Sequence, residues 1–142
     1  MKNNSSWINQ LKYRWCNIHP YSEAIPIMTK DGSKYWICLD KRRPINIYIE
    51  KNARSCGVIR LIWDEEHLGL CDFYIKPNYR GKGLGTKLLS WLILYASQDN
   101  IHQIEALVIP ENNKDYDRLM SWYLRQGFYR GSPERRSIIM DL

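Results

Sequence analysis

The sequence predicts an α/β protein of the α+β type, with one mixed, mostly antiparallel sheet, a central parallel strand pair and flanking helices. Residues 45–49 and 57–63 are strand-like and are joined by a polar turn, which is typical of an antiparallel hairpin. Residues 70–75, 84–97 and 104–108 follow as strand, helix and strand. This order produces a parallel pair, because the chain must cross over the sheet between the two strands. With 142 residues, the whole chain, 1–142, is expected to form one domain.

The first forty residues give weaker patterns. Trp7, Leu11 and Trp15 lie at helical spacing, so we expect a short amphipathic helix over residues 5–17, which Pro20 prevents from continuing. Residues 24–28 and 35–39 are strand-like. A plausible hairpin turn, Lys30-Asp31-Gly32-Ser33, separates them.

A second amphipathic helix is expected to begin near Asp115 or Asp117, either of which can cap it. Gly127 suits the left-handed position beyond a helix end, Phe128 begins a short strand, and residues 137–142 form a closing strand. The helix carries its large side chains at the spacing of one buried face: Tyr116, Leu119, Met120, Tyr123 and Leu124.

Composition excludes several classes of protein. The longest apolar run, 88–96, is much shorter than the roughly twenty residues that a membrane span needs. Residues 1–6 are polar and no apolar block follows them, so we predict no secretory signal, no membrane partner and a cytoplasmic location. The net charge of +6 favours anionic partners. The cysteines show no metal-ligand or disulfide spacing, so no metal is predicted: Cys16, Cys38, Cys56 and Cys71.

The most informative stretch is the glycine loop at 80–86, RGKGLGT, between the strand at 70–75 and the following helix. Glycines let a backbone approach a ligand closely, and the free N–H groups at a helix start bind phosphate. A Walker P-loop does not fit, because the Gly-Lys pair comes at the front of the loop. A dinucleotide fingerprint needs a small residue at Thr86 and an acidic residue near Glu105, and 142 residues leave too little room for its repeated βαβ units.

Two motifs in this region resemble those of the GNAT superfamily of N-acetyltransferases. Arg80, Gly83 and Gly85 fit that family's R/Q-x-x-G-x-G/A motif for acetyl-CoA, and the preceding Ile-Lys-Pro-Asn-Tyr is similar to the end of its fourth strand. Some forty residues later, the stretch 122–128, WYLRQGF, resembles the family's Y-x-x-x-G-F ending. The resemblance covers the predicted cofactor-binding core, 45–142, well and residues 1–44 poorly.

The resemblance implies acetyl-CoA as the acyl donor and assigns the residues that hold it. In the family the two parallel strands splay apart at a bulge in the first of them, and the pantetheine arm lies in the gap. Two helices after the first strand frame the acceptor there, whereas here one helix precedes it. The implied cofactor-binding residues are Phe73, Tyr74, Ile75, Arg80, Gly81, Lys82, Gly83, Leu84, Gly85, Thr86 and, of Asn112 and Asn113, Asn113.

The resemblance also implies the catalytic groups. Tyr123 is the expected acid that protonates the leaving thiolate, and backbone N–H groups near Tyr74 and Ile75 are expected to stabilise the oxyanion. The alternative is that Tyr123 is a core tyrosine. Asp72 is the chosen general base, with Glu105 and the acidic residues Glu65 and Glu66 as other candidates.

The predicted function is transfer of an acetyl group from acetyl-CoA to a primary amine by direct attack in a ternary complex. The acceptor is a protein lysine, a protein N-terminus or a small-molecule amine, and the enzyme is a monomer or a homodimer. One alternative is a module that binds acyl-CoA or a protein without catalysis. Another is an acetyltransferase for RNA or an RNA-bound target, with nucleic acid the less favoured partner and clusters such as Arg135-Arg136 as its contact points.

Overall fold

One eight-stranded sheet organises the fold. The computed structural model describes residues 23–142 except 41–44, 53 and 65, so the helix expected over residues 5–17 lies outside the described residues. The elements are β1 (Glu23–Met28), β2 (Lys34–Asp40), β3 (Ile45–Lys51), β4 (Arg54–Asp64), β5 (His67–Ile75), η1 (Pro77–Tyr79), α2 (Leu84–Gln98), β6 (Gln103–Leu107), η2 (Asn113–Asp115), α3 (Tyr116–Arg125), β7 (Tyr129–Arg130) and β8 (Ser137–Asp141).

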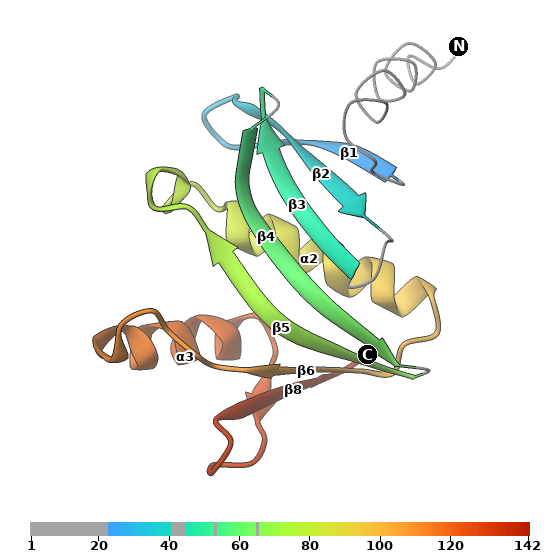
Figure 1. Cartoon of the computed structure of the whole chain (residues 1–142), viewed down its shortest axis with the longest axis vertical. Coiled ribbons are helices and arrows are strands. Elements are labelled where there is room, and N and C mark those ends of the chain that lie inside the picture. The colour runs from blue at the N-terminus through green and yellow to red at the C-terminus, as the bar shows by residue number, and fades with distance from the viewer. Residues whose placement is uncertain (1–22, 41–44, 53, 65) are drawn as a thin grey trace.

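The sheet topology confirms the predicted fold class. Strands follow the order β1-β2-β3-β4-β5-β6-β8-β7, and every neighbouring pair is antiparallel except β5 and β6. The parallel pair arises because α2 connects these strands and packs across one face of the sheet (Figure 1). None of the described helices is long and apolar enough to cross a membrane.

The core lies between the sheet and α2. Leu88, Leu89, Leu92 and Ala96 of the helix are fully buried, as their i, i+3, i+4 spacing predicts. Alternate residues of the strands meet them, among them Ile37, Leu39, Ile47, Ile49, Ile59 and Leu61. The opposite residues of β4 therefore point to the other face of the sheet.

Several expectations about the ends of the elements differ from the structure. The polar turn expected over residues 51–55 is shorter, because β3 continues through Lys51 and β4 begins at Arg54. The strand expected to include Val108 ends at Leu107, and the Val108 N–H donates to the Arg136 carbonyl instead, at 3.0 Å. Asp115 precedes α3 but makes no side-chain cap; its carboxylate pairs with the guanidinium of Arg118 at 3.1 Å.

Gly127, which follows α3, has a φ of +102°, which confirms the predicted left-handed position.

The parallel pair separates partway along its length. β5 and β6 are in register only from His67 to Leu70 and from Gln103 to Ala106. Leu61 faces Leu70 while Arg60 faces Asp72, so Cys71 is an extra residue that forms a β-bulge in β5. Beyond it β5 stays paired with β4, and Figure 1 shows β5 and β6 diverging from there toward their C-terminal ends. The splay that the family resemblance implied is therefore present.

Glycine is required at position 57, where β4 pairs with the end of β5. A Cβ at this position would lie 2.6 Å from both the Tyr74 carbonyl oxygen and the Ile75 Cδ1 atom. We expect Gly57→Ala to lower the free energy of unfolding by about 1–3 kcal/mol, because the backbone oxygen cannot move away without shifting the strand. Urea denaturation measures this. Gly69→Ala is the matched control, since its nearest contact would be an ordinary 3.6 Å; an equal loss in both variants would contradict the explanation.

Candidate active site

A cleft of about 470 Å³ opens where β5 and β6 separate. Its walls come from the glycine loop, the end of β5, the segment after β6 and one side of α3. The lining residues are Phe73, Ile75, Tyr79, Arg80, Gly81, Gly83, Leu84, Gly85, Thr86, Ile109, Pro110, Glu111, Asp115, Arg118, Leu119, Trp122 and Arg125. The cleft therefore joins segments that are more than forty residues apart in the sequence.

The loop wall is a helix start with no side-chain cap. Gly83 is the residue before α2, and both Gly81 and Gly83 have a φ of +78°. An added Cβ at either position would meet nothing within 4 Å, so glycine is favoured there by the left-handed backbone and not by lack of space. Because the cap residue Gly83 has no side chain to accept from the first N–H groups of α2, these donors and the helix dipole are available to an anion.

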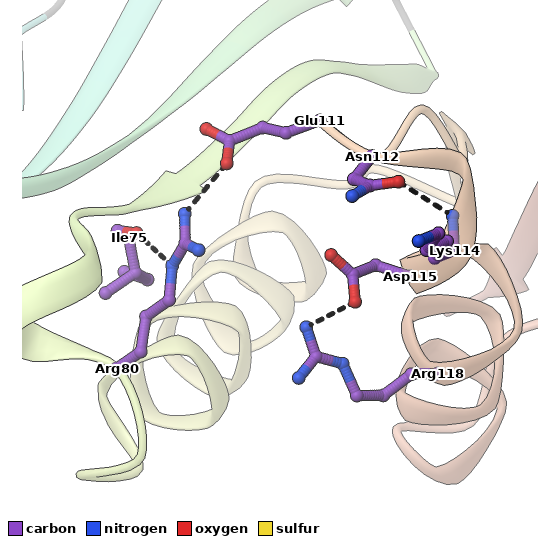
Figure 2. Close-up of polar contacts among 7 residues, drawn as sticks. All are labelled: Ile75, Arg80, Glu111, Asn112, Lys114, Asp115 and Arg118. Atoms are coloured by element: carbon purple, nitrogen blue, oxygen red, sulfur yellow. Dashed lines mark hydrogen bonds and ion pairs between the residues drawn. The ribbon is translucent and has the colours of Figure 1, made fainter.

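Arg80 spans the opening between the two separated strands. Its Nε donates to the Ile75 carbonyl oxygen at 2.7 Å, and its guanidinium lies 5.3 Å from the centroid of the Tyr74 ring. Its Nη2 pairs at 3.4 Å with Glu111, which follows β6, as Figure 2 shows. The Arg80 side chain thus fixes the end of β5 to the loop and also reaches the opposite wall.

The wall formed by α3 adds two cations that sequence reasoning missed. Arg118, Trp122 and Arg125 are spaced i, i+4 and i+7, so they form one stripe beside the buried face of the helix, and all three line the cleft. Figure 2 shows the Arg118 side chain extending from α3 toward α2. The spacing was readable in the sequence, but nothing in the sequence indicated that this stripe faces the glycine loop.

The inner part of the cleft is aromatic. The rings of Phe73 and Trp122 stack with centroids 5.5 Å apart and planes 21° apart, which connects β5 to α3. Gly85 lies against this pair, and a Cβ there would make ordinary 3.6 Å contacts with both rings. Phe73 and Trp122 therefore form an aromatic part of the cleft wall.

Tyr123 lies beside this pair and not on the wall of the cleft. Its ring centroid is 4.9 Å from that of Trp122 and 6.4 Å from that of Phe73, and the residue is only 3% exposed. The prediction that it faces inward is confirmed. Burial raises the pKa of the Tyr123 phenol above its ordinary value, so the hydroxyl keeps its proton at neutral and mildly alkaline pH.

Three of the predicted cofactor-binding residues, Tyr74, Lys82 and Asn113, do not line the cleft. Lys82 is exposed, with its Nζ 5.7 Å from the centroid of the Tyr79 ring. Asn113 is exposed at the start of η2, while the Asn112 side chain accepts from the Lys114 N–H. Tyr74 lies under Arg80. Eight of the predicted residues do line it: Phe73, Ile75, Arg80, Gly81, Gly83, Leu84, Gly85 and Thr86.

Asp72 lies on the sheet face away from α2. Its partner across β4 is Arg60, which is exposed between the buried residues Ile59 and Leu61. The two side chains form an ion pair, with Arg60 Nη1 and Asp72 Oδ2 3.0 Å apart. A second candidate base, Glu105, is half-buried on β6 in register with Gly69, before the strands separate. Of the remaining two candidates, Glu66 is exposed and Glu65 lies outside the described residues.

Comparison with known proteins adds independent support for this architecture. The sequence profile of the Acetyltransferase (GNAT) family matches residues 8–128. An uncharacterized N-acetyltransferase of Methanocaldococcus jannaschii is 26% identical over 102 residues, which are 72% of this chain and 42% of that protein. The chain thus spans less than half the length of this curated relative.

Two solved structures show the same fold. The GNAT domain of S. lividans PAT has a TM-score of 0.69 at 11% identity, covering 84% of this chain and 97% of that one. The PaiA N-acetyltransferase of Thermoplasma acidophilum, solved with coenzyme A, has a TM-score of 0.58 at 19% identity, covering 68% of this chain and 60% of that one.

Proposed function

Since the chain belongs to the acetyltransferase (GNAT) family, we propose that it transfers an acetyl group from acetyl-CoA to a primary amine. The observation that carries the proposal is the cleft itself, in which an uncapped helix start leads into the gap between β5 and β6. A diphosphate suits the first part of this path and an extended, largely apolar arm suits the second. The similar PaiA structure, which contains coenzyme A, supports the same donor.

The residues present fit a polyanionic donor. The loop N–H groups from Gly81 to Thr86 would bind the diphosphate, because the Arg80 N–H already donates to the Pro77 carbonyl oxygen. The side chains of Arg80, Arg118 and Arg125 would add positive charge. The aromatic pair Phe73 and Trp122 would contact the arm. Glu111 opposes anion binding, and its pairing with Arg80 offsets part of this effect.

The chemistry follows from what these groups can do. Bound acetyl-CoA supplies an activated thioester, and the edge of β5 that has lost its partner strand supplies N–H donors near Tyr74 and Ile75 for the oxyanion. Tyr123 keeps its proton at neutral pH and donates it to the leaving thiolate, and the same burial that raises its pKa makes the phenol a weaker acid than a free tyrosine. Asp72 accepts a proton from the amine at the point where the splay begins.

A second candidate function is binding of acyl-CoA without catalysis. It is favoured by the position of Tyr123, which is 3% exposed and does not line the cleft. A protein that had kept the loop and lost the chemistry would show this arrangement.

Two measurements on one preparation separate these functions. Calorimetry should give acetyl-CoA binding in the micromolar range, and a thiol reagent should detect coenzyme A release that requires an amine from a broad panel. Binding without amine-dependent thiol release would identify the non-catalytic module. No binding of acetyl-CoA would contradict both functions.

A further inference from the structure

In the described part of the chain, the connections that precede the splay are too short to frame an acceptor with helices. The connections between β1 and β5 consist of residues 29–33, 41–44, 52–53 and 65–66, and none is long enough to contain the two helices that the family resemblance places there. Among the described residues, the side chains of β4 and β5 next to the splay are therefore placed to recognise the acceptor. The charged pair on this face at that point is Arg60 and Asp72.

We propose that Arg60 and Asp72 form a binding site for a zwitterionic acceptor, the α-ammonium and α-carboxylate of a free amino acid. This inference rests on the proposed function. The acceptor amine must reach a thioester carbon held at the free edge of β5, and the bulge at Cys71 places Asp72 at the start of that edge. The ammonium lies against the Asp72 carboxylate and the acceptor carboxylate against the Arg60 guanidinium.

The charge of the pair favours a zwitterion over a simple amine. A lone ammonium is attracted by Asp72 and repelled by Arg60, whose Nη1 is only 3.0 Å from the carboxylate, so the two effects largely cancel. An amino acid places each of its charges against the opposite one, and a guanidinium offers a planar fork that fits a carboxylate. The side chains of Arg60 and Asp72 are 53% and 58% exposed, so both are accessible and opening their ion pair costs little.

The protons and bonds of the transfer can be accounted for with the groups present. The α-ammonium loses one proton to Asp72, and its nitrogen then forms a bond to the thioester carbonyl carbon. The C–S bond breaks, and Tyr123 gives its proton to the sulfur. A second proton leaves the nitrogen; one proton restores Tyr123 and the other goes to water. The products are an N-acetyl amino acid and free coenzyme A.

The test compares amino acids with the amines that remain when their carboxylate is removed, such as phenylalanine with phenethylamine. With saturating acetyl-CoA, the wild-type protein should acetylate amino acids with a KM at least tenfold below that of the matched amines. Arg60→Gln should raise the KM for amino acids by about tenfold to a hundredfold and lower the KM for the matched amines, because it removes the cation that repels a lone ammonium. The KM of Arg60→Lys for amino acids should fall between the values of the wild type and of Arg60→Gln, because lysine keeps the positive charge but lacks the planar guanidinium.

Arg54→Gln is the matched control, because it removes the same charge from an exposed position at the start of β4 and should change neither KM. Equal use of amino acids and matched amines, or transfer only to lysyl peptides, would overturn this inference and leave the proposed function intact. An equal effect of Arg60→Gln on both acceptors would also overturn it. Absence of transfer to every acceptor would instead overturn the proposed function, and the inference with it.

Discussion

Replacing Tyr123 with phenylalanine is expected to lower kcat by about a hundredfold or more, with little change in the KM for acetyl-CoA. The substitution removes the proton donor and keeps the ring, whose edge-to-face contacts with Trp122 and Phe128 hold this part of α3 in place. Steady-state kinetics with a thiol reagent measure both constants. The loss falls on kcat because the proton is needed only when the thiolate forms.

Tyr116→Phe is the control for this prediction. Tyr116 is the first residue of α3, its ring lies under the Arg136 guanidinium, and it does not line the cleft. Its loss of a hydroxyl should leave kcat unchanged. An unchanged kcat in Tyr123→Phe would remove Tyr123 from the mechanism and favour the non-catalytic alternative.

Replacing Arg80 with alanine is expected to weaken acetyl-CoA binding by about tenfold to a hundredfold, the range for loss of a charge-assisted contact. Arg80 contributes a cation at the glycine loop and a hydrogen bond to the Ile75 carbonyl oxygen at the end of β5. Calorimetric titration gives the dissociation constant. The difference from wild type should shrink as salt is added, because both Arg80 and the cleft are partly exposed.

Glu111→Ala is the matched substitution for Arg80→Ala and should have the opposite effect on acetyl-CoA binding. It removes a carboxylate from a cleft that receives an anion, and it releases the Arg80 guanidinium from its 3.4 Å ion pair. Binding of acetyl-CoA should be as tight as in wild type or tighter. If Glu111→Ala weakened binding as much as Arg80→Ala, the ion pair would matter as a structural brace of the cleft and not through the charge of Arg80.

Local sequence patterns were sufficient to predict the elements and the order that makes β5 and β6 parallel. The glycine loop between a strand and a helix was predicted, and its Gly81 and Gly83 both have a φ of +78°. The face of α3 was also predictable, because side-chain spacing determines which residues are buried, and Tyr123 is buried. These features depend on residues that are close together in the chain.

The features that sequence reasoning missed depend on tertiary placement. The bulge at Cys71 sets the register that brings Asp72 opposite Arg60, and no alternation in β5 revealed it. Arg118 and Arg125 were not singled out from the sequence, because they line the cleft only through the placement of α3 beside the glycine loop. Asp115 had the residue type of a helix cap, yet it pairs with Arg118, since a nearby cation competes for the same carboxylate.

A crystal structure with acetyl-CoA tests the central claim most directly. The account predicts the diphosphate on the N–H groups from Gly81 to Thr86, the pantetheine arm between β5 and β6, and the thioester sulfur within hydrogen-bond distance of the Tyr123 hydroxyl. A diphosphate bound away from the glycine loop, or a sulfur separated from Tyr123 by the Phe73 and Trp122 rings, would contradict it.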